Sequence, residues 1–280
     1  DRFETHAAAT TAMLMNIPIA HIHGGEITEG AVDEKIRHSI TKMSSLHFTS
    51  TDEYRNRVIQ MGEFVDTVFS VGAPGIDNIV NMNLLSKSEL EDELEWKINR
   101  TTALFTFHSE TLSKTNSREE IKEILKIIDK SNLNILFTYA NSDDGGRAIN
   151  NEIEKFALKD KDRYRVVKSL GQLKYLSAMK QLDIVIGNTS SGIIESASFQ
   201  KPVINIGCRQ SGRLQSGNVI DSTVEELTKS IDRALSKDFL ERLKKKKNIY
   251  GDGKTASKII DLLKSQKISV IKKFNNLVEG

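Results

Sequence analysis

The chain has 280 residues, of which 38% are hydrophobic and 28% charged, a composition that suits one or two packed domains and not a disordered chain. Its 40 Lys and Arg against 38 Asp and Glu leave a net charge of +2, which argues against a nucleic-acid coat or a polybasic membrane anchor. No apolar run approaches the roughly 18 residues of a membrane span, and the single cysteine, Cys208, excludes an internal disulfide and a multi-thiolate zinc site. We therefore expect a soluble, cytoplasmic protein that binds neither nucleic acid nor membrane.

Short β-rich segments alternate with amphipathic helical patterns along nearly the whole chain. We predict strands at 17–22, 46–49, 68–71, 103–107, 135–139, 165–167, 184–186 and 203–206. Helices are expected between them, at 33–43, 52–61, 119–128, 152–158, 173–179 and 223–235. Several of the strands lack polar alternation, which is typical of strands covered on both faces. Strand–helix–strand alternation therefore predicts an α/β fold with parallel sheets.

The predicted strands fall into two groups. A boundary is expected near Ala73-Pro74-Gly75, after the first three strands, and a charged stretch at 86–99 precedes the other five. We assign 1–78 to a first domain, 79–253 to a second, and 254–280 to a C-terminal helix and tail. Three strands are few for an independent sheet of this class, and the chain starts within a helical pattern, so we expect the first domain to be incomplete.

The first polar cluster, His21–Glu26, follows the strand at 17–22 and leads through a loop to Asp33. Ligands of open parallel sheets bind at the carboxyl ends of strands, and His23, Glu26 and Asp33 are candidates for proton transfer. The alternative is that Asp33 only caps the next helix and pairs with Arg37. A zinc site at the two histidines is disfavoured, because neighbouring strand residues alternate faces and no third ligand is evident.

The second cluster, Gly187-Asn188-Thr189-Ser190-Ser191-Gly192, leads from a buried strand into a helix expected at 193–199. A small-residue turn of this kind at a helix start presents free N–H groups to an anion. Glu195, one turn further, is placed to accept hydrogen bonds from a ribose diol. An ordinary serine N-cap would explain one of the serines but not the whole run.

The third cluster, Gly207–Arg213, follows the strand at 203–206 and contains two arginines, whose forked donors suit a diphosphate or a carboxylate. His108 follows the strand at 103–107 and is expected at the same edge of the sheet. Cys208 is not expected to act as a nucleophile, because no nearby residue is identified as its base.

These clusters resemble, in order, the motifs of the hydrolysing UDP-N-acetylglucosamine 2-epimerases of bacterial sialic acid synthesis and their sister group acting on UDP-diacetylbacillosamine. Asp1–Glu4, His21–Glu26, Asp33–Lys42, Phe107–Leu112, Gly187–Glu195 and Asn205–Arg213 carry the resemblance, which extends over about residues 1 to 265. It implies a GT-B-like fold of two Rossmann-like parallel-sheet domains with the UDP-sugar in the cleft between them. It also implies that the N-terminal quarter of a typical member is missing, so that the fragment alone is expected to be inactive.

The resemblance implies inversion at C2 of the sugar with loss of UDP. The steps are an anti-elimination to a 2-acetamidoglucal and the addition of water, which convert UDP-N-acetylglucosamine to N-acetylmannosamine. The family implies no metal, no cofactor and a homodimer. By position, Asp1 and Asp33 belong to the catalytic set, and either His23 or Glu26 completes it. The implied UDP-binding residues are His108, Ser190, Ser191, Gly192, Glu195 and Arg213.

Three alternatives remain open from the sequence. The first is the same reaction on UDP-N,N'-diacetylbacillosamine, in a legionaminic acid pathway. The second is a non-hydrolysing UDP-N-acetylglucosamine 2-epimerase, which would return a UDP-sugar instead of a free sugar. The third is a UDP-binding module without turnover, which would be stabilised by UDP but would form no product.

Overall fold

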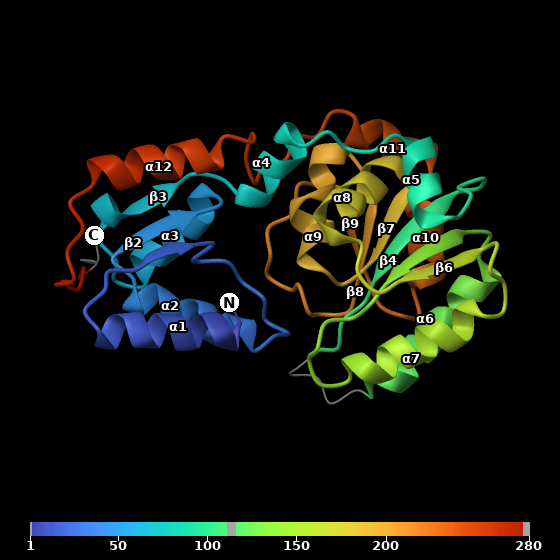
Figure 1. Cartoon of the computed structure of the whole chain (residues 1–280), viewed down its shortest axis with the longest axis horizontal. Helices are drawn as coiled ribbons and strands as arrows, with labels where there is room; N and C mark the ends of the chain where they lie inside the picture. The colour runs from blue at the N-terminus through green and yellow to red at the C-terminus, as the bar shows by residue number, and fades with distance from the viewer. Residues whose placement is uncertain (1, 111–115, 277–280) are drawn as a thin grey trace. The chain divides into compact units, whose positions relative to one another are not determined.

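The chain folds around two separate parallel sheets (Figure 1). The computed structural model describes residues 2–110 and 116–276. Unit 1 combines the chain up to residue 81 with the chain from residue 249 onward, and unit 2 comprises residues 82–248.

Unit 1 contains a three-stranded sheet in the order β1-β2-β3, all parallel. Its strands are β1 (Ala20–Ile22), β2 (Leu46–Thr49) and β3 (Val68–Ser70). Its helices are α1 (Phe3–Leu14), α2 (Asp33–Met43), α3 (Asp52–Gln60), the short η1 (Val65–Thr67), α4 (Pro74–Asn81) and α12 (Thr255–Ser265).

Helix α12 packs against the sheet of unit 1 although it lies far away in the sequence. Its Ile259 joins a buried cluster with Leu46, Phe48 and Val71. The carboxylate of Asp77 in α4 accepts hydrogen bonds from the first backbone N–H groups of α12, those of Thr255 (2.9 Å) and Ala256 (2.7 Å). These N–H groups have no partner within their own helix, so Asp77 caps α12 from outside.

The segment after α12 is anchored on unit 1 by Lys272. Its ammonium group lies 2.6 Å from the buried carboxylate of Glu63 and donates to the carbonyl oxygens of Lys42 and Ser44 at the end of α2. Burial opposes the ionisation of Glu63, but hydrogen bonds from His47, Lys272 and Lys42 outweigh it and lower the pKa of this carboxyl to about 2. Lys42 and Lys272 therefore keep the Glu63 carboxylate ionised, and the ion pair of Lys272 with Glu63 holds the segment after α12 on unit 1.

Unit 2 contains a six-stranded parallel sheet in the order β6-β5-β4-β7-β8-β9. The strands are β4 (Thr102–Thr106), β5 (Asn134–Thr138), β6 (Tyr164–Val167), β7 (Ile184–Gly187), β8 (Val203–Ile206) and β9 (Val219–Ser222). The helices are α5 (Lys87–Leu94), α6 (Ser117–Lys130), α7 (Gly146–Ala157), α8 (Gly171–Gln181), α9 (Ser190–Ile194), η2 (Ser196–Phe199), α10 (Leu227–Ala234) and α11 (Lys237–Leu243).

Helices cover both faces of this sheet (Figure 1). Phe105 of β4 points into a core formed with α6, α7 and α10, whereas its neighbour Leu104 points into a second core formed with α5 and α8. Successive strand residues face opposite sides of a sheet. Both faces must therefore be apolar, which is why these strands show no polar alternation.

The winding of unit 2 creates a topological switch point. The chain starts at the central strand β4, moves outward through β5 and β6, then returns to β7 on the other side of β4 and continues through β8 to β9. The segments that follow the neighbouring strands β4 and β7 therefore run to opposite sides. Ligands of doubly wound sheets bind in the crevice that this divergence leaves at the carboxyl edge.

The prediction of an α/β fold with parallel sheets is confirmed, and every strand expected from the sequence is present. Two details differ. The first strand begins at Ala20 and not at residue 17, because Pro18 has no N–H to donate to a ladder. Strand β9 was not predicted, since its four residues, Val219–Ser222, are two apolar followed by two polar ones, which is too short a pattern to indicate a strand.

A pH-dependent stability of unit 1 follows from His21. Its ring lies in β1 beside its register partner His47 of β2, and Nδ1 is 3.2 Å from the Thr41 hydroxyl. Burial, with further contributions from His47 and Arg37, lowers the pKa of His21 to about 3. The unfolded chain binds this proton from about pH 6.5 downward and the folded chain does not, so stability is lost as the pH falls from about 6.5 towards 3, by up to about 1.4 kcal/mol per pH unit.

The measurement is native-state hydrogen exchange of the β2 amides between pH 7 and pH 4. We expect the opening free energy to fall with acidification in the wild type and to fall less steeply in His21→Asn, whatever the absolute stability of that variant. The same change at the partly exposed His6 serves as control and should keep the wild-type slope. An unchanged slope in His21→Asn would contradict the assignment.

Candidate functional site

The strand ends at the switch point of unit 2 lie close together because β7 approaches β4 through a glycine. Gly187 is the last residue of β7, has φ +141°, and pairs with Thr106. A Cβ at this position would collide with the carbonyl oxygen of Thr106. Glycine is therefore required for the close approach of the two strands at this edge.

Asn188 links the segment after β7 to the segment after β4. Its amide oxygen accepts a hydrogen bond from the backbone N–H of His108, and its amide nitrogen donates to the carbonyl oxygen of His108, both at 2.8 Å. His108 is thereby held at the carboxyl edge, where the sequence predicted it.

The ring of His108 has a defined tautomer in its neutral form. Nδ1 lies 3.0 Å from the backbone nitrogen of Asn141, in the loop after β5. A backbone N–H can only donate, so Nδ1 is the acceptor and the neutral ring carries its proton on Nε2. An Nε2–H group is a donor suited to a phosphate oxygen.

The N-cap of α9, the helix after β7, is a threonine and not one of the serines considered in the sequence analysis. Thr189 is the N-cap of α9, and its side chain accepts from the backbone N–H of Ser191. The serine-cap interpretation is wrong, since Ser190 and Ser191 lie in the first turn itself. Gly192 packs against β8, where a Cβ would lie 3.3 Å from a methyl group of Val203.

Glu195 follows α9, and near it lies a residue that the sequence did not single out, Tyr175 of α8. Burial raises the pKa of the Tyr175 hydroxyl, hydrogen bonding with Ser191 opposes this, and the Glu195 carboxylate adds to it. The hydroxyl also interacts with the side chains of Thr106 and Thr189. Tyr175 therefore belongs to the same cluster. From the sequence it is expected only to lie within the helix at 173–179.

A carboxylate from the loop after β4 binds the backbone of the loop after β8. Oε1 of Glu110 accepts hydrogen bonds from the backbone N–H groups of Cys208 (2.7 Å) and Arg209 (3.1 Å), and the Cys208 thiol donates to Oε2 at 3.0 Å. Gly207 has φ +79°, and a Cβ there would collide with the same carboxylate. Arg213, in this loop, is buried, with 7% of its surface exposed.

In unit 1 the first cluster forms a hydrogen-bonded pair. Nδ1 of His23 lies 2.6 Å from Oε1 of Glu26, and the Ser50 hydroxyl, at the end of β2, donates to the same oxygen at 2.8 Å. Glu26 is 2% exposed, whereas the side chain of His23 is 35% exposed. His23 also has φ +66°, in the left-handed region that a non-glycine residue rarely adopts.

Asp33 does not act as the cap of α2. The helix begins at Asp33, and its N-cap residue is Val32, whose own side chain makes no capping hydrogen bond. Arg37 pairs instead with Glu34 at 3.2 Å, and the carboxylate of Glu34 accepts from the backbone N–H of Thr28 at 2.6 Å. The capping interpretation of Asp33 is therefore wrong. Asp1, the other predicted acidic residue, lies outside the described residues.

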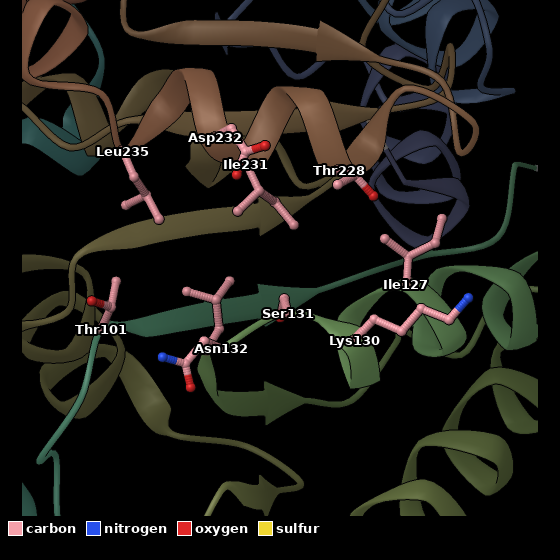
Figure 2. Close-up of a pocket in the computed structure, with 10 residues that line it drawn as sticks. Thr101, Ile127, Lys130, Ser131, Asn132, Thr228, Ile231, Asp232 and Leu235 are labelled. Atoms are coloured by element: carbon pink, nitrogen blue, oxygen red, sulfur yellow. The ribbon is translucent and has the colours of Figure 1, made fainter.

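A cavity of about 350 Å³ opens at the opposite edge of the unit 2 sheet (Figure 2). Lys130 and Ser131, at the end of α6, face Thr228 and Asp232 of α10 across it. Thr101 precedes β4, so this cavity lies at the amino ends of the strands. That edge is not where ligands of parallel sheets bind.

Within residues 2–110 and 116–276, no three His, Cys, Asp or Glu side chains are grouped so that they could hold a metal ion. In the same part of the chain, none of the helices has both the length and the apolar character needed to cross a membrane.

A family model described as UDP-N-acetylglucosamine 2-epimerase matches residues 1–264. The chain belongs to this family. It is 44% identical over 240 residues to the GDP/UDP-N,N'-diacetylbacillosamine 2-epimerase (hydrolyzing) of Campylobacter jejuni, a match that covers 85% of this chain and 62% of that protein. It is 36% identical over 267 residues to the UDP-N,N'-diacetylbacillosamine 2-epimerase (hydrolyzing) of Legionella pneumophila, covering 95% and 69%.

The fold is that of solved members of the family. The crystal structure of UDP-GlcNAc 2-epimerase from Neisseria meningitidis bound to UDP-GlcNAc superposes with a TM-score of 0.79 at 18% identity, covering 95% of this chain and 75% of that one. This confirms the predicted GT-B-like class with Rossmann-like domains. The chain spans 62% of the length of the Campylobacter relative.

The contact between Glu110 and Cys208 predicts an unreactive thiol. The hydrogen bond to Glu110, with burial and the carboxylate charge, raises the pKa of Cys208 to about 11. At pH 8 about 0.1% of such a thiol is ionised, against about 10% for a pKa near 9. We expect Glu110→Gln to accelerate alkylation of Cys208 by iodoacetamide at least several-fold. Glu123→Gln, on the exposed face of α6, is the control, and equal rates in both variants would contradict the contact.

Proposed function

We propose that this chain carries the nucleotide-binding and proton-transfer residues of a hydrolysing UDP-sugar 2-epimerase acting on UDP-N-acetylglucosamine. The observation that carries the proposal is the His23–Glu26 pair. A module that only binds UDP has no use for a histidine held in a strained backbone conformation by a buried carboxylate. Family membership supplies the reaction class.

The UDP would bind at the switch point of unit 2. His108 carries its ring proton on Nε2, and Ser190 and Ser191 place their hydroxyl groups in the first turn of α9. Gly192 keeps this turn close to β8. These donors, with the buried guanidinium of Arg213, suit the negative charge that grows on the diphosphate as the bond from C1 to oxygen breaks. Glu195 would accept hydrogen bonds from the ribose hydroxyls.

We assign the chemistry on the sugar to the His23–Glu26 pair of unit 1. The hydrogen bonds of this pair distinguish the roles of its two residues. The Glu26 carboxylate can only accept hydrogen bonds, and it accepts from Ser50 and from Nδ1 of His23. Neutral His23 therefore carries its proton on Nδ1 and exposes the Nε2 lone pair. We assign the acid–base role to His23 and the positioning role to Glu26.

Inversion at C2 requires two proton transfers. A base removes the C2 proton while the electron pair of the C1–oxygen bond leaves with UDP, which gives the glycal. Water then adds at C1, and an acid returns a proton to the other face of C2. Asp33, half-buried at the start of α2 and without the capping role, is our candidate for the second group.

A second candidate substrate is UDP-N,N'-diacetylbacillosamine, because two relatives that are 44% and 36% identical carry that substrate in their names. Both sugars present a 2-acetamido group and a C2 proton to the same chemistry. They differ at C4 and C6, so the reaction and the UDP site are common to both proposals.

The reaction is tested in deuterated water by ¹H and ³¹P NMR, with each UDP-sugar in turn. The samples are the chain itself and the chain extended at its amino end by the corresponding segment of the Campylobacter relative. We expect release of UDP and a free sugar deuterated and inverted at C2. An inverted sugar still attached to UDP would support the non-hydrolysing alternative, and UDP binding without release would support the binding module.

The roles within the pair are tested by two variants. His23→Gln should lower turnover at least about 100-fold, the lower end of what a positioned acid–base group contributes, and leave the dissociation constant of UDP unchanged. Glu26→Gln should lower turnover as well, because an amide can donate to Nδ1 and so reverse the tautomer. Glu29→Gln, exposed in the same loop, is the control. Full activity of His23→Gln would contradict the assignment.

A further inference from the structure

Asn188 is fully buried at the switch point, and its side chain acts as a substitute for backbone. The last backbone pair between β4 and β7 is Thr106 with Gly187, after which the two chains diverge. The Asn188 amide then bonds both the N–H and the C=O of His108 at 2.8 Å, as the next residue of a ladder would. A primary amide has the same donor and acceptor as a peptide group.

The backbone of Asn188 is used as well. Its N–H donates to the carbonyl oxygen of Thr106 at 3.2 Å. Its carbonyl oxygen accepts from the Arg209 guanidinium at 3.2 Å and from the Gln210 amide at 3.0 Å, both in the loop after β8. One residue therefore joins the chain segments that follow β4, β7 and β8.

These three segments carry the groups assigned to the UDP. His108 follows β4, Ser190 and Ser191 lie two and three residues after Asn188, and Arg213 is three residues after Gln210. Their relative positions would otherwise depend on three loops that leave the sheet in different directions. A rigid connection between the loops lowers the ordering cost of a ligand that must contact all of them.

We propose that Asn188 is a positioning residue of the nucleotide site, which sets the location of His108 relative to the first turn of α9 and to the loop that carries Arg213. The inference rests on the proposed function of that site. Asn188 acts through these neighbours and does not itself contact the nucleotide.

The chemistry of the amide gives a specific signature. In Asn188→Asp the introduced carboxylate still accepts from the N–H of His108, but it places a second oxygen against the carbonyl oxygen of His108 and repels it. Protonation of that carboxyl restores a donor of the same shape. The titratable and charged groups linked to this position are the ring of His108, Arg209, whose guanidinium donates to the carbonyl oxygen of Asn188, and Glu110, whose carboxylate accepts from the backbone N–H of Arg209. The loss of UDP affinity caused by Asn188→Asp should therefore decrease as the pH falls.

The test is the dissociation constant of UDP measured by calorimetry from pH 8 to pH 5.5, reported as the ratio of variant to wild type at each pH. We expect Asn188→Asp to weaken UDP binding at least tenfold at pH 8 and to recover part of that loss at pH 5.5. The control is Asn218→Asp, at the amino edge of the sheet, where a buried amide donates to the Ser196 hydroxyl (2.8 Å) and to the carbonyl oxygen of Lys201 (2.9 Å). It should stay within twofold of wild type.

A double-mutant cycle with Asn188→Ser and His108→Gln supplies a second readout, in case the carboxylate prevents folding. If Asn188 acts through His108, the double variant binds UDP about as weakly as the weaker single variant. Losses that multiply, or wild-type affinity in Asn188→Asp at pH 8, would overturn the inference. If the wild type itself does not bind UDP, the proposed function fails and not this inference alone.

Discussion

Strands β4 and β7 pair through Thr106 and Gly187, and their following segments then turn to opposite sides of the sheet. A buried backbone group that loses its ladder partner at such a point must find another. Gly187 allows the two strands to meet closely, and the Asn188 side chain supplies the missing donor and acceptor for His108. These contacts keep the strand ends together at the point where the segments that follow them diverge.

In unit 1, side-chain contacts also hold the backbone where the chain leaves the end of β1. The chain turns sharply through His23 and Gly25, both with positive φ, and the carbonyl oxygen of Gly25 accepts from the Arg57 guanidinium at 2.7 Å. Side-chain bulk at Gly25 would collide with the backbone of Tyr54. The turn brings the Glu26 carboxylate back to the end of β2, where Ser50 and His23 both bond to it. The strained backbone conformation of His23 is therefore held by the bond of its ring to Glu26 and by the bond of Arg57 to Gly25, two residues further along the chain.

The sequence was sufficient for eight of the nine strands in the described residues, because strands depend on local patterns. Short runs of predominantly apolar residues marked the strands, and polar residues directly after strands marked the carboxyl edges. It was not sufficient for contacts that only folding creates. The cap of Thr189, the pairing of Arg37 with Glu34 and the place of Tyr175 beside Ser191 each depend on geometry that spacing does not reveal. Ser50 was missed for the same reason, since its partner Glu26 belongs to another strand end.

A crystal structure of the chain soaked with UDP would locate the nucleotide directly. The diphosphate is expected beside Nε2 of His108 and the hydroxyl groups of Ser190 and Ser191, with the ribose hydroxyls on the carboxylate of Glu195. Two results would contradict a nucleotide site at the switch point. One is UDP bound in the cavity between α6 and α10. The other is a well-resolved carboxyl edge of β4 and β7 that holds no nucleotide at saturating UDP.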